Sequence, residues 1–243
     1  MTAAGSGTRL GHRLPKALVP LAGRPILSHA LDGVAAARVA DAVIVTAPPD
    51  LLDDVRSLAP GAVCVAGGES RQASVANALS ALPADVEVVL VHDAARPLTP
   101  PEVFHRVVDA VRSGHGAVVP AMPVVDTIKS SAPVMEVSRE GGSDAERAAR
   151  RAAAARRVGA IPLERVTGTV DRTTLRAVQT PQGFDRDLLV RAHTVPGGDI
   201  SDDAGLVEAL GEDVWLVAGS ERSLKITTPW DLELAEFLLA RSL

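Results

Sequence analysis

Short apolar runs alternate along this chain with longer stretches of helical periodicity, and this alternation limits the choice of folds. Five runs of four to six residues are rich in β-branched side chains and bounded by turn residues, so they predict buried strands: 42–46, 62–65, 86–91, 117–120 and 214–217. Four amphipathic stretches around them predict helices: 25–37, 49–58, 71–82 and 100–113. Strands that alternate with helices predict an α/β fold, with a mostly parallel sheet covered by helices on both faces.

Two of the expected helices have well-marked starts. Thr99 and Thr228 are each followed by a proline and, at the third position, by an acidic residue. These are the preferences of the N-cap, first and third positions of a helix. In a parallel α/β sheet, ligands bind beyond the carboxyl ends of the strands. We therefore expect the functional residues just after the predicted strands.

Composition narrows the class of protein. The chain has 243 residues, of which 47% are hydrophobic, so it can bury a sizeable core in one domain. No apolar run approaches the ~20 residues of a membrane span, and no segment has the order of a signal peptide. Cys64 is the single cysteine, which excludes an internal disulfide. The net charge of −5 argues against broad nucleic-acid binding. We expect a cytoplasmic protein that binds neither nucleic acid nor membrane.

A glycine-rich loop opens the chain. Residues 3–11 read Ala-Ala-Gly-Ser-Gly-Thr-Arg-Leu-Gly, and Lys16 follows soon after. Glycines let the backbone approach a ligand closely, and successive N–H groups in such a loop bind anions. The dinucleotide and P-loop fingerprints both fail, because the third glycine comes one residue late and Lys16 follows a proline. With the charges of Arg9 and Lys16, the loop suits a nucleoside triphosphate; the alternative is a glycine-rich surface turn.

The strand that should precede this loop is missing from the sequence. Only Met1 and Thr2 stand before Ala3, whereas the first strand is usually central in folds of this kind. Either the start codon is misassigned, or the chain was trimmed, or another segment fills that place. We favour the first of these.

A carboxylate stands where a triphosphate site needs one. Asp93 follows the strand 86–91 directly, and Mg²⁺ often takes one or two carboxylates together with phosphate oxygens. The alternative is a strand-end aspartate that caps the next turn. His92 is more often a structural histidine in such a place than an acid or base. Arg96 either pairs with Asp93 or holds the loop.

A second glycine-rich turn follows the strand 62–65. Gly67 and Gly68 allow a flat base to approach the backbone, and Ser74 lies on the first turn of the next helix, where a hydroxyl reads a base edge. Capping of that helix by Glu69 or Ser70 is an equally good interpretation of the same residues.

Further polar segments follow the later strands, and each either lines a site or forms a capped turn: 123–129, 169–172, 179–184, 200–204 and 223–229. Only three of the 25 basic residues are lysines: Lys16, Lys129 and Lys225. All three fall inside motifs found for other reasons. A lysine retained in an arginine-rich chain indicates a place where a compact ammonium is needed.

Together these motifs resemble those of the 2-C-methyl-D-erythritol 4-phosphate cytidylyltransferases, a family of the non-mevalonate isoprenoid pathway. The resemblance runs from Ala3 to the C-terminus, interrupted only by an Ala/Arg-rich stretch at about 139–157. Many sugar nucleotidyltransferases share the glycine-rich loop with its later Pro–Lys. Five segments are together highly specific: 92–97, 126–129, 169–172, 180–184 and 225–228.

The resemblance implies a single domain over residues 1–243, with a Rossmann-like nucleotidyltransferase fold and a protruding β-arm at 124–177. It implies a homodimer whose arms embrace. It also implies the reaction of CTP with 2-C-methyl-D-erythritol 4-phosphate to give the CDP-alcohol and pyrophosphate, with Mg²⁺ or another divalent cation. The stretch 139–157 lies in the arm and is interpreted as a solvated insertion without chemistry of its own.

The resemblance also implies roles for individual residues. The triphosphate would be held by the loop and two cations: Ala3, Ala4, Gly5, Gly7, Arg9 and Lys16. The cytosine would be surrounded by Gly68, Glu69 and Ser74. The methylerythritol phosphate would be contacted by Thr127, Ser201 and Lys225 and by the partner's Arg172. Asp93 would lie between that substrate and the metal, as a ligand of the metal. Arg9, Lys16 and Lys225 are the expected catalytic cations.

Two alternatives stay open at this point. Another sugar-phosphate nucleotidyltransferase, such as a ribitol-phosphate cytidylyltransferase, would share the glycine-rich loop and Lys16. A non-catalytic paralogue that binds nucleotide is favoured by the missing strand and the insertion. Against it stand the intact cations and carboxylate of the proposed site, for which a protein without catalytic activity has no need.

Overall fold

The computed structural model describes residues 1–3, 10, 14–133, 164–194 and 200–241. The chain divides into two compact units, Met1–Met122 with Ala177–Leu243 and Pro123–Arg176. Each unit is described by itself below. Of the helices that the structure describes, none is long and apolar enough to cross a membrane.

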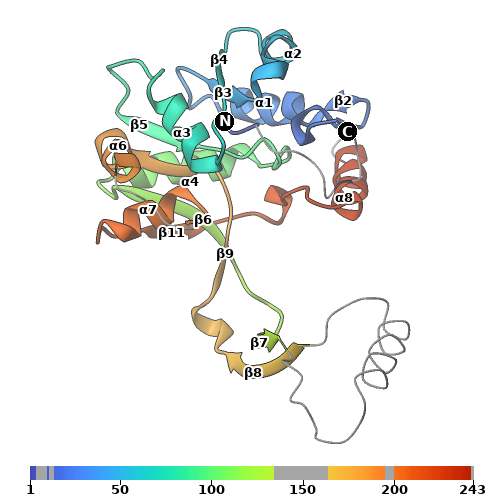
Figure 1. The fold of residues 1–243 in the computed structure, drawn as a ribbon, viewed down its shortest axis with the longest axis vertical. Coiled ribbons are helices and arrows are strands. Elements are labelled where there is room, and N and C mark those ends of the chain that lie inside the picture. Colours follow the sequence, from blue (N-terminus) through green and yellow to red (C-terminus); the bar gives the residue numbers. More distant parts are fainter. Residues whose placement is uncertain (4–9, 11–13, 134–163, 195–199, 242–243) are drawn as a thin grey trace, which may run out of the picture. The chain divides into compact units, whose positions relative to one another are not determined.

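The strands of the larger unit pair in mixed directions and are accompanied by helices, so the predicted α/β class is confirmed (Figure 1). Strands β3 (Ile44–Ala47) and β4 (Val63–Ala66) pair in parallel. Strands β5 (Val88–Val91), β6 (Ala117–Pro123), β10 (Gln182–Asp185) and β11 (Trp215–Ala218) pair in the order β11-β6-β10-β5, and β9 (Arg176–Val178) also pairs with β6. Strand β10 runs antiparallel to both β5 and β6, and β11 runs parallel to β6, so β5, β6 and β11 share one direction. The five predicted strands are confirmed, with ends that shift by a few residues.

The sequence did not predict β10. Its residues are mixed in polarity and include Gly183, so they lack the apolar pattern of a buried strand. The packing explains the glycine, because a Cβ at Gly183 would lie 2.3 Å from a methyl group of Val107 in the covering helix. The close packing of α4 against β10 therefore explains why a glycine stands in this strand.

Helices cover both faces of the sheet (Figure 1). They are α1 (Ile26–Ala37), α2 (Leu52–Leu58), α3 (Arg71–Leu79), α4 (Pro101–Arg112), α6 (Arg186–Thr194), α7 (Asp203–Ala209) and α8 (Pro229–Ala240). Side chains of β5 alternate between the faces: Val89 and Val91 pack in a core with α3, α6 and α7, whereas Val88 and Leu90 pack in a core with α4. The short pair β1 (Pro20–Leu21) and β2 (Arg24–Pro25) precedes α1.

Of the two predicted helix starts, the one at Thr228 is confirmed and the one at Thr99 is wrong. Thr228 caps α8 in a full capping box: its side chain accepts from the Asp231 N–H, and the Asp231 carboxylate accepts from the Thr228 N–H. The N-cap role predicted for Thr99 is wrong, because α4 begins at Pro101 and its N-cap is Pro100. A proline at the first helical position needs no hydrogen-bond partner for its nitrogen, and the Thr99 hydroxyl instead donates to the Arg96 carbonyl.

The first three residues lie between β3 and β5. Thr2 forms isolated parallel bridges with both Thr46 and Asp93. The Ala3 N–H donates to the Thr46 carbonyl at 2.9 Å, and the Thr2 N–H donates to the His92 carbonyl at 2.9 Å. Among the described residues before β1, Thr2 forms only these isolated bridges and belongs to no strand.

The smaller unit is built on one hairpin. Strands β7 (Ile128–Pro133) and β8 (Glu164–Val170) pair antiparallel, with an irregularity between Ser130 and Ser131. A 3₁₀ turn, Arg172–Thr174, follows β8. The predicted insertion at 139–157 lies outside the described residues.

Candidate active site

A cleft of about 300 Å³ opens at the carboxyl ends of β4 and β5 in the larger unit. It brings together seven of the predicted site residues: Ala3, Lys16, Gly68, Glu69, Ser74, Asp93 and Lys225. Thr2, Ala17, Ser70, Arg71, Ala94 and Ala95 complete its lining. These predicted site residues therefore lie together in one cleft beyond the strands.

Asp93 is the central charged residue of the cleft. Its side chain is 9% exposed, and its Oδ2 lies 2.7 Å from the Nζ of Lys225. Its Oδ1 accepts from the Thr2 hydroxyl at 3.2 Å and lies 3.5 Å from the Nε of Arg71. Burial opposes ionisation of Asp93, but the charges of Lys225 and Arg71 and the hydrogen bond from Lys225 outweigh it, so the pKa of Asp93 lies well below its usual value. The carboxylate is ionised at neutral pH.

Arg71 joins Asp93 to a second buried carboxylate. Its Nη1 lies 2.5 Å from the Oδ2 of Asp203, whose side chain is 1% exposed. Burial alone would lower the pKa of Arg71, but the charges of Asp203 and Asp93 raise it above its usual value. The other oxygen of Asp203 contacts the Nε2 of His193 at 2.9 Å. The cation is thus held between two carboxylates, which fixes it at the wall of the cleft.

Lys225 stands on a short connection that is anchored on both sides. The next residue, Ile226, is fully buried, and its N–H donates to the Ala95 carbonyl at 2.8 Å. The capping box of α8 follows directly, and the carboxylate of Asp231 also accepts from the Thr227 N–H at 2.8 Å. Lys225 itself is 42% exposed, so its stem is fixed while its ammonium reaches the cleft.

The loop from Gly68 to Ser74 has a defined shape. The Ser70 side chain caps α3 by accepting from the Ala73 N–H at 3.0 Å. The Ser74 hydroxyl donates to the Ser70 carbonyl at 2.9 Å and accepts from the Gly68 N–H at 3.0 Å. A Cβ on Gly68 would lie 2.4 Å from that of Ala73, so only glycine fits here. The two interpretations of this segment, helix capping and a binding loop, are thus compatible, because the cap shapes the loop that borders the cleft.

His92 is linked to the backbone of Asp93 through the Thr180 hydroxyl. His92 is buried, and the Thr180 hydroxyl lies 3.0 Å from its Nδ1 while accepting from the Asp93 N–H at 3.0 Å. Burial lowers the pKa of His92 to about 4, so the ring is neutral and its Nδ1 accepts the hydroxyl proton. The structural interpretation of His92 is confirmed.

Arg96 holds loops together and, in the part of the chain that the structure describes, forms no ion pair with Asp93. Its guanidinium donates to the Ser223 carbonyl at 2.6 Å and to the Val178 carbonyl at 3.2 Å. Of the two roles that the sequence left open for Arg96, the structure supports the second. The residue ties the segment after β5 to the segment that carries Lys225.

The remaining predicted site residues fall elsewhere. Ala4, Gly5, Gly7 and Arg9 lie outside the described residues. Thr127 and Arg172 belong to the smaller unit, where the Arg172 guanidinium donates to the Val125 carbonyl. Ser201 is exposed just before α7 and does not line the cleft.

The sequence interpretation missed Arg71 and Asp203. From the sequence, Arg71 is only the first residue of a predicted helix, and Asp203 only a member of the polar segment 200–204. A usable signal was that each lies at the first residue of a helix that follows a polar motif. Nothing in the sequence indicated that the two would pair, because they are 132 residues apart.

The cleft can bind and orient a polyanion. Lys16, Arg71 and Lys225 border it together, and Asp93 faces the same space. Among the described residues, no group of three His, Cys, Asp or Glu side chains is placed to hold a metal ion. A divalent cation here would have Asp93 as its protein ligand and would need ligand oxygens to complete its shell.

Comparison with known proteins gives one consistent result. The family model described as 2-C-methyl-D-erythritol 4-phosphate cytidylyltransferase matches residues 1–149 and 156–241. The protein of that name from Streptomyces avermitilis is 46% identical to this chain, over 98% of the chain and 90% of its own length. The one from Streptomyces coelicolor is 47% identical, over 98% of the chain and 83% of its own length.

Solved structures agree with the sequence comparison. The 2-C-methyl-D-erythritol 4-phosphate cytidylyltransferase from Thermus thermophilus has a TM-score of 0.73 and 35% identity, covering 98% of this chain and 96% of its own. The 4-diphosphocytidyl-2C-methyl-D-erythritol synthase from Anaerococcus prevotii has a TM-score of 0.74 and 28% identity, covering 99% and 96%. The similarity in sequence and in fold thus extends along almost the whole chain.

Proposed function

Because this chain belongs to the 2-C-methyl-D-erythritol 4-phosphate cytidylyltransferase family, we propose that the cleft around Asp93 carries out cytidylyl transfer. The enzyme transfers the cytidylyl group of CTP to 2-C-methyl-D-erythritol 4-phosphate, in the biosynthesis of isoprenoid precursors. The products are 4-diphosphocytidyl-2-C-methyl-D-erythritol and pyrophosphate. The observation that carries this proposal is the convergence of Lys16, Lys225 and Arg71 around Asp93 in one cleft.

The reaction needs positioning more than acid–base chemistry. An oxygen of the methylerythritol phosphate attacks the α-phosphorus of CTP, and the bond from that phosphorus to the β-phosphate oxygen breaks to release pyrophosphate. The attacking phosphate is already an anion, so no base has to remove a proton from it. The protein must instead bring two anions together and stabilise the charge that develops at the α-phosphorus.

The cations of the cleft meet this need. We assign Lys16 and Arg9 to the triphosphate, together with backbone N–H groups of the loop from Ala3 to Gly7. We assign Lys225 to the reacting phosphates, because it reaches the cleft from an anchored connection. Asp93 keeps Lys225 and Arg71 in place through the two ion pairs described above.

Each substrate is assigned its own group of residues. Gly68, Glu69 and Ser74 would surround the cytosine, where the shaped loop offers a flat approach to its backbone. Thr127, Ser201 and the partner's Arg172 would contact the methylerythritol phosphate. The last assignment requires a homodimer, in which the smaller unit of one copy, Pro123–Arg176, serves the cleft of the other.

We assign Asp93 as the one protein ligand of a divalent cation, Mg²⁺ in the first place. Mg²⁺ is commonly bound through one or two carboxylates plus substrate phosphates, and Asp93 is an ionised carboxylate that borders the cleft. Lys225 and Arg71 hold the Asp93 carboxylate at the cleft, where it would be available to the cation. When bound, the cation neutralises charge on the triphosphate. We place the reaction in the cytoplasm, where nucleoside triphosphates are made.

A pyrophosphate-release assay tests this function directly. CTP and Mg²⁺ are supplied with methylerythritol phosphate, with ribitol phosphate, or with no acceptor. We expect release only with methylerythritol phosphate. Equal release with ribitol phosphate would indicate another sugar-phosphate nucleotidyltransferase, and no release with any acceptor would indicate a non-catalytic paralogue. Replacing Mg²⁺ by EDTA should abolish release, and sedimentation of the protein tests the dimer.

A further inference from the structure

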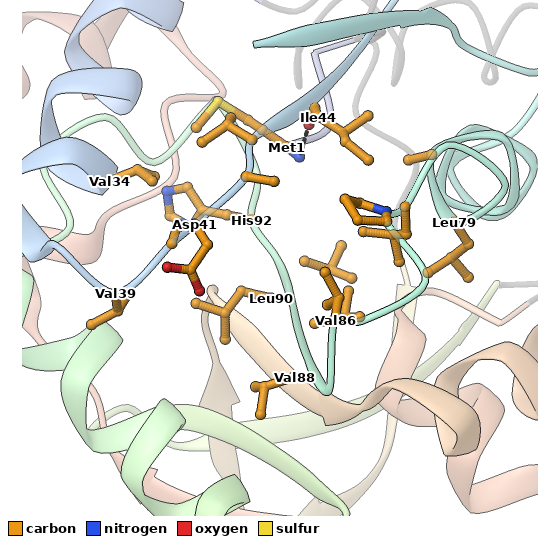
Figure 2. Close-up of a pocket in the computed structure, with 18 of the residues that line it drawn as sticks. Met1, Val34, Val39, Asp41, Ile44, Leu79, Val86, Val88, Leu90 and His92 are labelled. Atoms are coloured by element: carbon orange, nitrogen blue, oxygen red, sulfur yellow. Dashed lines mark hydrogen bonds between the residues drawn. The ribbon is translucent and has the colours of Figure 1, made fainter. Parts of the chain in front are cut away.

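A buried histidine that lies outside the cleft contacts a carboxylate that supports the cleft. His193 stands near the end of α6, and its side chain is 4% exposed. It lines neither the cleft nor a second cavity, of about 500 Å³, that lies between β3 and β5 and has a mostly apolar lining (Figure 2). His193 therefore borders none of the space assigned to the substrates, and any effect on the reaction has to pass through its contacts.

The two ring nitrogens of His193 are in opposite situations. Nε2 lies 2.9 Å from the Oδ1 of Asp203, and an ion-paired carboxylate only accepts hydrogen bonds, so Nε2 carries a proton and is the donor. Nδ1 is buried and has no hydrogen-bond partner among the described residues. An unpaired polar atom in the interior is costly, and an apolar side chain at this place would avoid that cost. The contact with Asp203 is therefore what explains a histidine here.

Asp203 divides its two oxygens between His193 and Arg71. Oδ2 lies 2.5 Å from the Nη1 of Arg71, and the Asp203 side chain is 1% exposed. The last torsion of an aspartate side chain has broad minima, so one contact leaves the carboxylate free to turn. Two contacts, one at each oxygen, fix its plane. The histidine thus sets the angle at which Asp203 meets Arg71.

The backbone that carries Asp203 is held by other groups. Asp202 caps α7 by accepting from the Gly205 N–H at 3.0 Å. The other oxygen of Asp202 accepts from the side-chain amide of Gln182 at 2.7 Å. Loss of the His193 donor should therefore leave the start of α7 in place and free only the Asp203 carboxylate.

Arg71 extends this arrangement to the cleft. Its guanidinium is planar and rigid, so a change of angle at Nη1 also moves Nε, which lies 3.5 Å from the Oδ1 of Asp93. Asp93 in turn pairs with Lys225, the cation assigned to the reacting phosphates. A misplacement of about 1 Å costs on the order of 10²-fold in rate. Even a small shift of Arg71 should therefore be measurable in kcat.

We propose that His193 is a positioning residue for cytidylyl transfer and acts through Asp203 and Arg71. The ring fixes the Asp203 carboxylate, and this carboxylate holds Arg71 at the angle that keeps Asp93 in its place. His193 itself does no chemistry on the substrates. This inference rests on the function proposed for the cleft, and it adds a support on α6 to the residues that border the cleft.

Steady-state pyrophosphate release by variants of His193 tests the proposal. His193→Leu removes the donor, and we expect kcat to fall about tenfold or more at a temperature where circular dichroism shows a folded protein. His193→Gln places an amide nitrogen near the position of Nε2, so kcat should return to within about threefold of the wild type. The matched control is Leu188→Ala, a core truncation on the same helix, which should lower stability but keep kcat within about twofold.

A double-mutant cycle shows whether the effect passes through Asp203. In the Asp203→Asn background, His193→Leu should lower kcat by less than about twofold further, because residues that act as one unit are not additive. Equal losses in the two backgrounds would overturn the proposal. A folded His193→Leu enzyme as active as Leu188→Ala, or no more active after His193→Gln, would overturn it as well. If His193→Leu does not fold, His193→Asn replaces it, since its shorter amide places a donor at the position of Nδ1 instead of Nε2.

A second readout separates this inference from the proposed function. The Nε–H of Arg71 gives an NMR signal, and its hydrogen exchange with water reports how firmly the guanidinium is held. We expect this exchange to be at least about tenfold faster in His193→Leu and unchanged in Leu188→Ala. If the wild-type protein releases no pyrophosphate, the proposed function is wrong, and the exchange at Arg71 decides the positioning role by itself. Equal exchange in the wild type and in His193→Leu would overturn that role.

Discussion

The Nζ of Lys225 lies 2.7 Å from the Oδ2 of Asp93, at the wall of the cleft. The two side chains differ in exposure, at 42% for Lys225 and 9% for Asp93. The carboxylate therefore stays with the core, while the ammonium can turn toward an entering phosphate. Arg71 remains beside Asp93 when it does so.

Replacing Lys225 tests its role at the reacting phosphates. We expect Lys225→Ala to lower kcat/KM by about 10²–10³-fold, because one well-placed donor is lost from the transition state. The fold should survive, since Arg71 still pairs with Asp93. Pyrophosphate release and circular dichroism provide the measurements. The matched control is Arg191→Ala, a surface cation paired with Glu212; a folded Lys225→Ala enzyme as active as this control would remove Lys225 from the mechanism.

Lys16 is expected to act on the triphosphate. Lys16→Ala should lower kcat/KM for CTP by about 10²-fold or more, with a smaller effect on the KM for methylerythritol phosphate. Lys16→Arg should restore only part of the activity, because a planar guanidinium does not replace a compact ammonium. Steady-state kinetics with each substrate varied in turn separate the two constants. A defect confined to the methylerythritol phosphate side would contradict the assignment.

Asp203 is expected to position Arg71. Asp203→Asn leaves Arg71 without its 2.5 Å ion-pair partner in a buried site, which should reduce the free energy of unfolding by about 3 kcal/mol. Because Arg71 then also holds Asp93 less firmly, kcat should fall as well. Urea unfolding and kinetics measure the two effects. Asp187→Asn, which removes an 84% exposed carboxylate paired with Arg186, should change stability by less than about 1 kcal/mol. Equal effects at both positions would argue against a positioning role.

His92 should make stability depend on pH. Its pKa is lowered from 6.5 to about 4 in the folded protein, so the unfolded chain binds more protons between these values. The free energy of unfolding should therefore fall as pH is lowered from 6.5 to 4, by up to about 3 kcal/mol for this group. Urea unfolding at several pH values measures the slope. In His92→Gln the slope over this range should be smaller, and an unchanged slope would show that other groups cause it.

Gly68 should tolerate no side chain. In Gly68→Ala the new Cβ would lie 2.4 Å from the Cβ and 3.0 Å from the carbonyl carbon of Ala73, so the loop must move. We expect a loss of about 1–3 kcal/mol in stability and a higher KM for CTP. Gly33→Ala is the control: its Cβ meets only the Thr99 carbonyl oxygen at 3.5 Å, and alanine in helix α1 should be neutral or stabilising. If both variants change stability and the KM for CTP to the same extent, the close contact at Gly68 does not matter for function.

Much of the cleft was predictable because local sequence carries it. A polar residue directly after a β-branched run lies at the carboxyl end of a strand, and this rule placed Asp93 and the Gly68 loop at one edge of the sheet. The capping box of α8 was equally local, and it anchors the connection of Lys225. The resemblance to one family added the substrates and roles that no local pattern contains.

Other features depended on contacts between distant segments. Strand β10 has no strand pattern of its own, and Gly183 fits there only because Val107 packs against it. Arg96 was equally suited to pair with Asp93 or to hold a loop until the positions of the Ser223 and Val178 carbonyls were known.

Taken alone, the sequence of this protein determined its α/β class, its family and the identity of most residues around the cleft, because periodicity, caps and motifs are properties of neighbouring residues. The tertiary structure alone decided which charges meet: Arg71 lies between Asp93 and Asp203, and Lys225 against Asp93. It also placed Thr2 between Thr46 and Asp93, which are far apart in the sequence. Ion pairs and sheet neighbours depend on distances through space, and only the folded chain sets those distances.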